Sequence, residues 1–167
     1  MLYGNNNSNN RNAGNQEKFS FDWNFLNSGY SSKENILKEN IIRDDAMKIA
    51  KVLAKGQTKD EKISNTQLRA FYNDVKALEN RIDDKKSEEE QQKDYEAVYP
   101  FVLMLEAKAA YKHREKNDKI PKMFREFIEK NVEVMRKDKK VKTFQDFCKF
   151  FEAVVAYYYG FGGKDNK

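Results

Sequence analysis

The sequence predicts an all-α fold, a single-domain bundle of about five or six helices that follows a disordered N-terminal tail. Three observations support this class. The 167 residues include only two prolines and seven glycines, and 35% of them are charged, which suits the surfaces of helices. Apolar residues recur at spacings of three and four along most of the chain. The length is sufficient for one hydrophobic core.

The chain begins with two segments that lack helical spacing. Residues 1–16 are rich in asparagine and almost without apolar side chains, so we expect a disordered tail. Residues 17–33 form an aromatic arm whose alternation resembles a strand, although no second strand is available to pair with it. We expect an irregular segment that packs either on the helices or on another molecule. Its large apolar residues are Phe19, Phe21, Trp23, Phe25, Leu26 and Tyr30.

Residues 34–164 form the predicted helical bundle domain. Helical spacing runs from Ser32 to Lys55, with a possible break at residues 43–45, and Gly56 is a natural helix stop. The residues that carry this spacing are Ile36, Leu37, Ile41, Ile42, Ala46, Ile49, Ala50 and Leu53.

A second helix is predicted to begin after Ser64, because Ser64 and Gln67 have the spacing of a capping box. Its core-facing residues are Leu68, Phe71, Tyr72, Val75, Leu78 and Ile82.

An acidic stretch at residues 83–96 follows, and the sequence leaves its structure open. From Asn65 to Tyr99 there is no glycine or proline. If the helix continued through this stretch, it would be a rod of roughly 35 residues, about 50 Å long. Residues 99–164 would then pack on a second chain and form an exchanged dimer. If the stretch is a loop, the same contacts close within one chain.

Two prolines mark the expected starts of later helices. Residues 99–115 are apolar on almost every side as far as Tyr111, which predicts a central, buried helix with Pro100 in its first turn. Pro121 fits the first turn of the next helix. The inner face of that helix is predicted to carry Phe124, Phe127, Ile128, Val132 and Met135.

The last helix is predicted to follow a cap formed by Thr143 and Asp146, and to end at Gly160. The three consecutive tyrosines at 157–159 cannot all face the core, so at least one must face solvent or a partner. The expected core stripe consists of Phe144, Phe147, Cys148, Phe151, Val154, Val155 and Tyr158.

The sequence leaves little room for catalysis. Cys148 and His113 are the only residues of their types, which excludes an intramolecular disulfide, a two-histidine metal site and a Cys/His cluster. We expect no enzymatic activity, cofactor or metal. No apolar run approaches the roughly 18–20 residues that span a membrane, and no signal peptide is recognisable, so we expect a cytoplasmic protein.

One strip of the second helix is rich in hydrogen-bond donors. Arg69, Asn73, Lys76 and Asn80 follow each other by four, three and four residues, so they share a face that contains no carboxylate. Arg69 and Lys76 are about 10.5 Å apart along the helix axis. Such a strip suits the phosphates and sugars of an RNA strand without reading its sequence. The alternative is a solvated surface.

Residues 106–142, with thirteen bases and seven acids, also suggest a surface that attracts polyanions.

Three segments in order resemble a known family: "QLRAFYNDVKALE", "YPFVLMLEAKAAYKHR" and "FQDFCKFFEAVVAYYYGFGGK". Together they are similar to the small helical subunit of the type III-A CRISPR effector, the Csm interference complex, over residues 43–164. The resemblance implies a non-catalytic subunit for antiviral defence. Several copies are expected to stack along the guide RNA and to help hold single-stranded target RNA beside other Csm subunits.

The resemblance also implies a set of RNA-facing residues. Arg69 belongs to its first motif, while Lys108, Lys112 and Arg114 surround Tyr111 in its second. Asn73 and Lys76 join them from helical geometry alone. Lys108 and Lys112 have an alternative interpretation, in which their stems cover a buried helix and their ammonium groups reach water. For the whole chain, the alternative is a helical protein–protein interaction module whose exposed aromatics dock another protein, without direct RNA binding.

Overall fold

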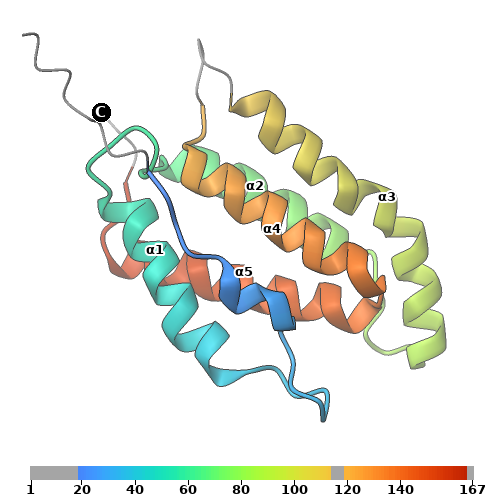
Figure 1. Ribbon diagram of the computed structural model, residues 1–167. Coiled ribbons are helices and arrows are strands. Elements are labelled where there is room, and N and C mark those ends of the chain that lie inside the picture. The colour runs from blue at the N-terminus through green and yellow to red at the C-terminus, as the bar shows by residue number, and fades with distance from the viewer. Residues whose placement is uncertain (1–18, 114–118, 165–167) are drawn as a thin grey trace, which may run out of the picture.

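The computed structural model describes residues 19–113 and 119–164 (Figure 1). Within these ranges it contains five α-helices and no β-strand, which confirms the predicted all-α bundle. The predicted tail at 1–16 lies outside the described residues. The helices are α1 (Ala46–Lys55), α2 (Asn65–Glu79), α3 (Glu88–Lys112), α4 (Lys122–Asp138) and α5 (Val141–Gly160), preceded by a 3₁₀-helix η1 (Asn24–Ser28) and a π-helix η2 (Ile41–Asp45).

Helix α5 lies at the centre of the bundle. It packs against α1, α2, α3 and α4, and Figure 1 shows it running across the molecule, below α2 and α4 in this view. Tyr158 is buried, Tyr159 is exposed and Tyr157 is intermediate, as the three consecutive tyrosines required. The buried side chains of α5 are Phe144, Asp146, Phe147, Cys148, Phe150, Phe151, Val154, Val155 and Tyr158.

The prediction that residues 99–115 form the central helix is wrong. α3 lies at the edge of the bundle (Figure 1) and exposes 48% of Phe101 and 61% of Met104. Only one of its faces is buried, although both faces carry apolar residues. Pro100 is likewise not in the first turn but inside the helix, because α3 begins twelve residues earlier, at Glu88. α3 changes direction about halfway along its length in Figure 1, as expected for a helix that contains a proline.

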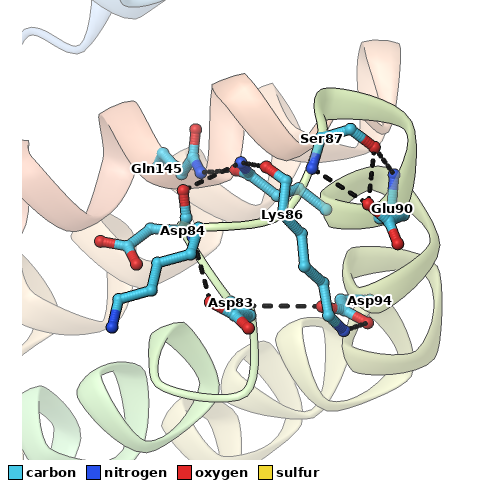
Figure 2. A network of polar contacts seen from close by, with 9 residues as sticks. Asp83, Asp84, Lys86, Ser87, Glu90, Asp94 and Gln145 are labelled. Carbon is cyan, nitrogen blue, oxygen red and sulfur yellow. Dashed lines mark hydrogen bonds and ion pairs between the residues drawn. The ribbon is translucent and has the colours of Figure 1, made fainter.

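The connection between α2 and α3 is a short turn, so the continuous rod is wrong and so is the basis for an exchanged dimer. Ser87 caps α3 with a capping box: its Oγ accepts the Glu90 N–H at 3.4 Å, and Glu90 Oε2 accepts the Ser87 N–H at 3.1 Å (Figure 2). The Lys86 ammonium bonds Asp94 at 3.0 Å and ties the turn to the helix. α3 therefore folds back onto α2 and α5 of the same chain.

The aromatic arm packs on the helices of its own chain. Trp23 and Tyr30 are buried, and the Trp23 indole N–H donates to Glu126 of α4 at 3.0 Å. The Tyr30 hydroxyl donates to Oδ1 of Asn131 at 2.6 Å, and the Asn131 amide donates to the Phe127 carbonyl at 2.7 Å. This chain of bonds satisfies polar groups that would be costly to bury alone.

The helix predicted from Ser32 begins later than expected. Ser31 and Leu37 form an isolated antiparallel bridge, so residues 31–37 make a turn. The π-helix η2 occupies the place where a break was suspected. It buries Asp45, which accepts a bond from the Asn40 amide at 3.1 Å, and burial raises the pKa of this carboxyl.

The predicted cap of the last helix is also wrong, because α5 begins at Val141. The Thr143 hydroxyl donates to Asp138 at 2.6 Å. Asp146 is buried, where it accepts bonds from the Lys142 ammonium and the Ser31 hydroxyl, each at 2.6 Å. Thr143 thus binds the end of α4, and Asp146 binds Ser31 and, within α5, Lys142, so neither residue caps the helix. Among the described residues, no helix has the length and apolarity needed to cross a membrane.

Tyr30→Phe should lower the free energy of unfolding by about 1–3 kcal/mol, because it leaves Oδ1 of buried Asn131 without its donor. Tyr159→Phe is the matched control. Tyr159 is 42% exposed, so we expect a loss below about 1 kcal/mol. Urea denaturation measures both, and equal losses would contradict the role given to the buried bond.

Ser87→Ala should lower the free energy of unfolding at pH 7 by about 1 kcal/mol, as for other N-caps. The bonds with Ser87 lower the pKa of Glu90 below its ordinary 4.5. The wild-type advantage is therefore complete above pH 4.5 and shrinks as the pH falls through the lowered pKa. Denaturation of both proteins between pH 7 and pH 3 measures this difference, with exposed Lys85→Ala as the control. A pH-independent difference would show that the carboxylate takes no part.

Candidate nucleic-acid interface

Helix α2 holds the predicted donor strip at a fixed angle to the core. Ser64 caps the helix and accepts the Gln67 N–H at 3.3 Å, which is one half of the predicted capping box. The other half does not form, and within the described part of the chain Gln67 Oε1 is buried without a partner. The predicted apolar stripe is confirmed, since Leu68, Phe71, Val75, Leu78 and Ile82 are buried and Tyr72 packs against the core.

The donor strip has an open end and an acidic end. Arg69 and Asn73 are exposed, and no ion pair joins Arg69 to a carboxylate of the described residues. Lys76 binds Glu79 at 2.5 Å, and this bond raises the pKa of the Lys76 ammonium. Asn80 borders a hollow that is also lined by Glu79, Asp83, Asp84 and Gln145. None of the four strip residues is acidic. The carboxylates of Glu79, Asp83 and Asp84 nevertheless lie near its Lys76–Asn80 end.

Lys108 lies on a different flank of α2. Its ammonium binds Asp74 and lies 4.9 Å from the centre of the Phe71 ring. Asp74 and Lys76 are two residues apart, which is a rotation of about 200° around the helix, so the two lysines are on opposite flanks. Lys112 is half-buried at the end of α3, and Arg114 lies outside the described residues. The predicted RNA-facing residues therefore form two groups.

The first and last motifs of the sequence meet in space. The Tyr158 hydroxyl donates to the Ile63 carbonyl at 2.9 Å, just before α2, and the Tyr159 hydroxyl donates to Asn65. Gly163 closes over Tyr158: its N–H donates to the Tyr158 carbonyl at 3.0 Å, and a Cβ at Gly163 would lie 2.2 Å from the ring. The aromatic Gly-Gly end thus positions the N-terminus of α2.

His113 and Cys148, the two residues best suited by type to catalysis, both make contacts that stabilise the fold. Nδ1 of His113 lies 3.0 Å from the Ile120 carbonyl, across the connection between α3 and α4. Cys148 is buried in the core, and burial raises the pKa of its thiol. No group of three or more His, Cys, Asp or Glu side chains in the described ranges is arranged to hold a metal ion.

Sequence reasoning missed two surfaces. One is the exposed apolar face of α3, which the even distribution of apolar residues concealed. The other is the turn between α4 and α5, where "RKDKKVK" places five cations and one carboxylate at residues 136–142. That run was visible in the sequence, but only as part of the positive charge of residues 106–142.

Gly163→Ala should lower the free energy of unfolding by about 1–3 kcal/mol, because the added methyl group collides with the buried Tyr158 ring. Gly160→Ala is the control: nothing lies within 4 Å of a Cβ there, and the position is helical. We expect it to be neutral or to stabilise by up to about 1 kcal/mol. Thermal unfolding distinguishes the two, and a harmless Gly163→Ala would contradict the close approach.

A family model described as Csm2 Type III-A matches residues 40–164, which include all five α-helices but not the aromatic arm. No curated protein and no solved structure matched the chain.

Proposed function

The chain belongs to the Csm2 family of type III-A CRISPR systems, and we propose that it acts as a non-catalytic subunit that binds RNA through the phosphate backbone. Family membership makes it a component of the Csm complex. The observation that supports RNA binding most directly is the donor strip of α2, where Arg69 and Asn73 are exposed beside a rigid core face.

The chemistry of the strip suits a backbone better than bases. An Arg guanidinium presents several N–H groups to phosphate oxygens, and Asn donates to phosphate or sugar oxygens. The side chains project from one straight helix, so they follow a strand and do not enclose a base. Binding should then be independent of sequence. Lys108 and Lys112 provide a second group on the other side of α2, where Asp74 neutralises part of the charge.

The structural contacts of His113 and Cys148 support the proposal of a non-catalytic role. The histidine ring bonds a backbone carbonyl, and the thiol has a raised pKa inside the core. Both groups are thus employed in holding the bundle together. In this proposal the subunit works in the cytoplasm and contributes binding surface to the ribonucleoprotein.

A second candidate function is docking of other proteins, and the outer face of α3 favours it. Phe101, Met104 and Tyr111 are exposed there by 48%, 61% and 63%. Their spacing of three and seven residues places them along one stripe. A stripe of this kind suits other Csm subunits, further copies of this chain included, and does not compete with RNA for α2.

Arg69→Gln together with Lys76→Gln should weaken binding to single-stranded RNA about tenfold at 0.15 M salt, equally for uridine and adenosine oligomers. The reason is counterion release, which contributes about 0.7 to the log–log salt slope for each contacted phosphate. The parent slope should be about −2 or steeper, for three or more contacts, and the variant slope should be shallower by about 1.4. Fluorescence anisotropy across a salt series measures these quantities.

Lys51→Gln with Lys55→Gln is the matched control, because it removes the same charge from exposed positions of α1. We expect the control to bind nearly as well as the parent. If the α2 variant binds like the control, the strip is only a solvated surface. A strong preference among RNA sequences would indicate base readout and contradict the proposal.

A further inference from the structure

We propose that the turn between α4 and α5 is a second surface for RNA phosphates. We call residues 136–142 the basic turn. The inference rests on the proposed function and deepens it by adding a phosphate-binding surface that neither the donor strip nor the family motifs include.

The cations of the basic turn are less neutralised than those of α2. Arg136, Lys137, Lys139 and Lys140 are all exposed, and no ion pair joins any of them to a carboxylate of the described residues. Only the fifth cation, Lys142, is paired, with Asp146. On α2 and α3, by contrast, two of the predicted RNA-facing lysines bind carboxylates.

The single carboxylate of the turn is used to fix its backbone. Asp138 accepts the Lys140 N–H at 3.2 Å and the Thr143 hydroxyl at 2.6 Å. From α3, Gln92 donates to the Lys139 carbonyl at 3.0 Å and accepts the Val141 N–H at 2.8 Å. The turn is therefore held from both sides, and its cations project from a rigid frame. Such preorganisation reduces the entropy lost on binding.

The requirements of folding explain only two of the four exposed cations. Arg136 and Lys137 lie in the last turn of α4, where positive charge is favoured by the helix dipole. Lys139 has a left-handed backbone with φ of 53°, a conformation that favours Gly or Asn. Lys140 is the N-cap residue of α5 and makes no side-chain cap, at a position that favours Ser, Thr, Asp or Asn and disfavours positive charge. α2 and α3 both begin with a capping serine.

Two lysines thus occupy positions where other residues would stabilise the fold better. Violations of local rules that cluster at one place are expected at functional sites. The Lys139 ammonium lies 5.6 Å from the centre of the Tyr99 ring, but neither lysine is paired with a carboxylate of the described residues. A polyanion is the ligand that suits these two lysines beside two further cations. Within a Csm subunit, that polyanion is the backbone of the bound RNA.

Two hollows adjoin the basic turn, one on each side. Lys137 borders a hollow shared with Lys33, Lys140 and Lys142 on the side of the aromatic arm. On the opposite side it borders a second hollow, whose lining includes Arg136, Lys139, Tyr99 and Leu103. Cations therefore line both hollows, from the arm to the flank of α3, together with Asp138 and Asp146 in the first and Glu133 in the second.

The test compares the effects of one variant on fold stability and on RNA affinity, which we expect to change in opposite directions. Lys139→Gly with Lys140→Ser should raise the melting temperature by roughly 2–4 °C, because it supplies a residue suited to the left-handed position and a capping hydroxyl. The same variant should bind single-stranded RNA about tenfold more weakly at 0.15 M salt, with a slope shallower by about 1.4. A merely structural role for the lysines predicts no such loss in a more stable protein.

The controls separate this inference from the proposed function. Lys51→Gln with Lys55→Gln removes equal charge from α1, which lies across the bundle from the turn (Figure 1). Lys137→Gln with Lys140→Gln leaves Lys139 in place and should also weaken binding several-fold. Both measurements use the full chain and a uridine oligomer.

Each outcome has one meaning. If the parent binds no RNA, the proposed function fails. If the parent binds and the α2 variant weakens it, but both turn variants bind like the parent or the α1 control, the proposed function stands and this inference is overturned. It is equally overturned if the turn variants keep full RNA affinity but no longer co-purify with other Csm subunits, because the surface then binds protein.

Discussion

The structure depends on one interaction above all, the packing of α4 on α5 through aromatic rings. The Phe127 ring lies 5.3 Å from Phe151, 5.7 Å from Phe150 and 6.5 Å from Phe147, measured between ring centres. Each fully buried aromatic side chain removes roughly 150–250 Å² from water, which is worth about 4–6 kcal/mol before conformational entropy is counted. The arm extends this cluster through Trp23, and α2 reaches it through Phe71, whose ring contacts Phe124 of α4. This cluster fixes α2, α4 and α5 relative to one another.

How much of the fold was predictable depends on how cleanly each helix separates its faces. The stripes of α2, α4 and α5 were correct because their apolar residues recur on one side only. α3 was placed wrongly because Phe101 and Met104 imitate a buried face, and a sequence does not show which side a neighbour covers. The start of α3 was nevertheless readable: Ser87 and Glu90 have the spacing of a capping box, a local signal that outweighs the absence of glycine and proline.

The sequence predicted which residue types make up the candidate site. It did not predict which carboxylates pair with the lysines of that site. Helical geometry predicted that Arg69, Asn73 and Lys76 share one strip, and all three lie within α2. The pairing of Lys108 with Asp74 joins residues 34 positions apart, so it emerges only when α3 packs on α2. The cations after α4 escaped notice for a different reason. What sets these cations apart is the backbone angle of Lys139 and the exact residue at which α5 begins. Helix boundaries are the least certain part of any sequence interpretation.

The closed connection between α2 and α3 has a consequence for assembly. Because each chain completes its own core, it can fold as a monomer. Joining a complex then requires no unfolding and no exchange of segments. Under the proposed function, chains would join the RNA as folded monomers, and the rate of joining would be proportional to the concentration of free chains. The length of RNA, and not a fixed pairing of chains, would then set how many copies a particle holds.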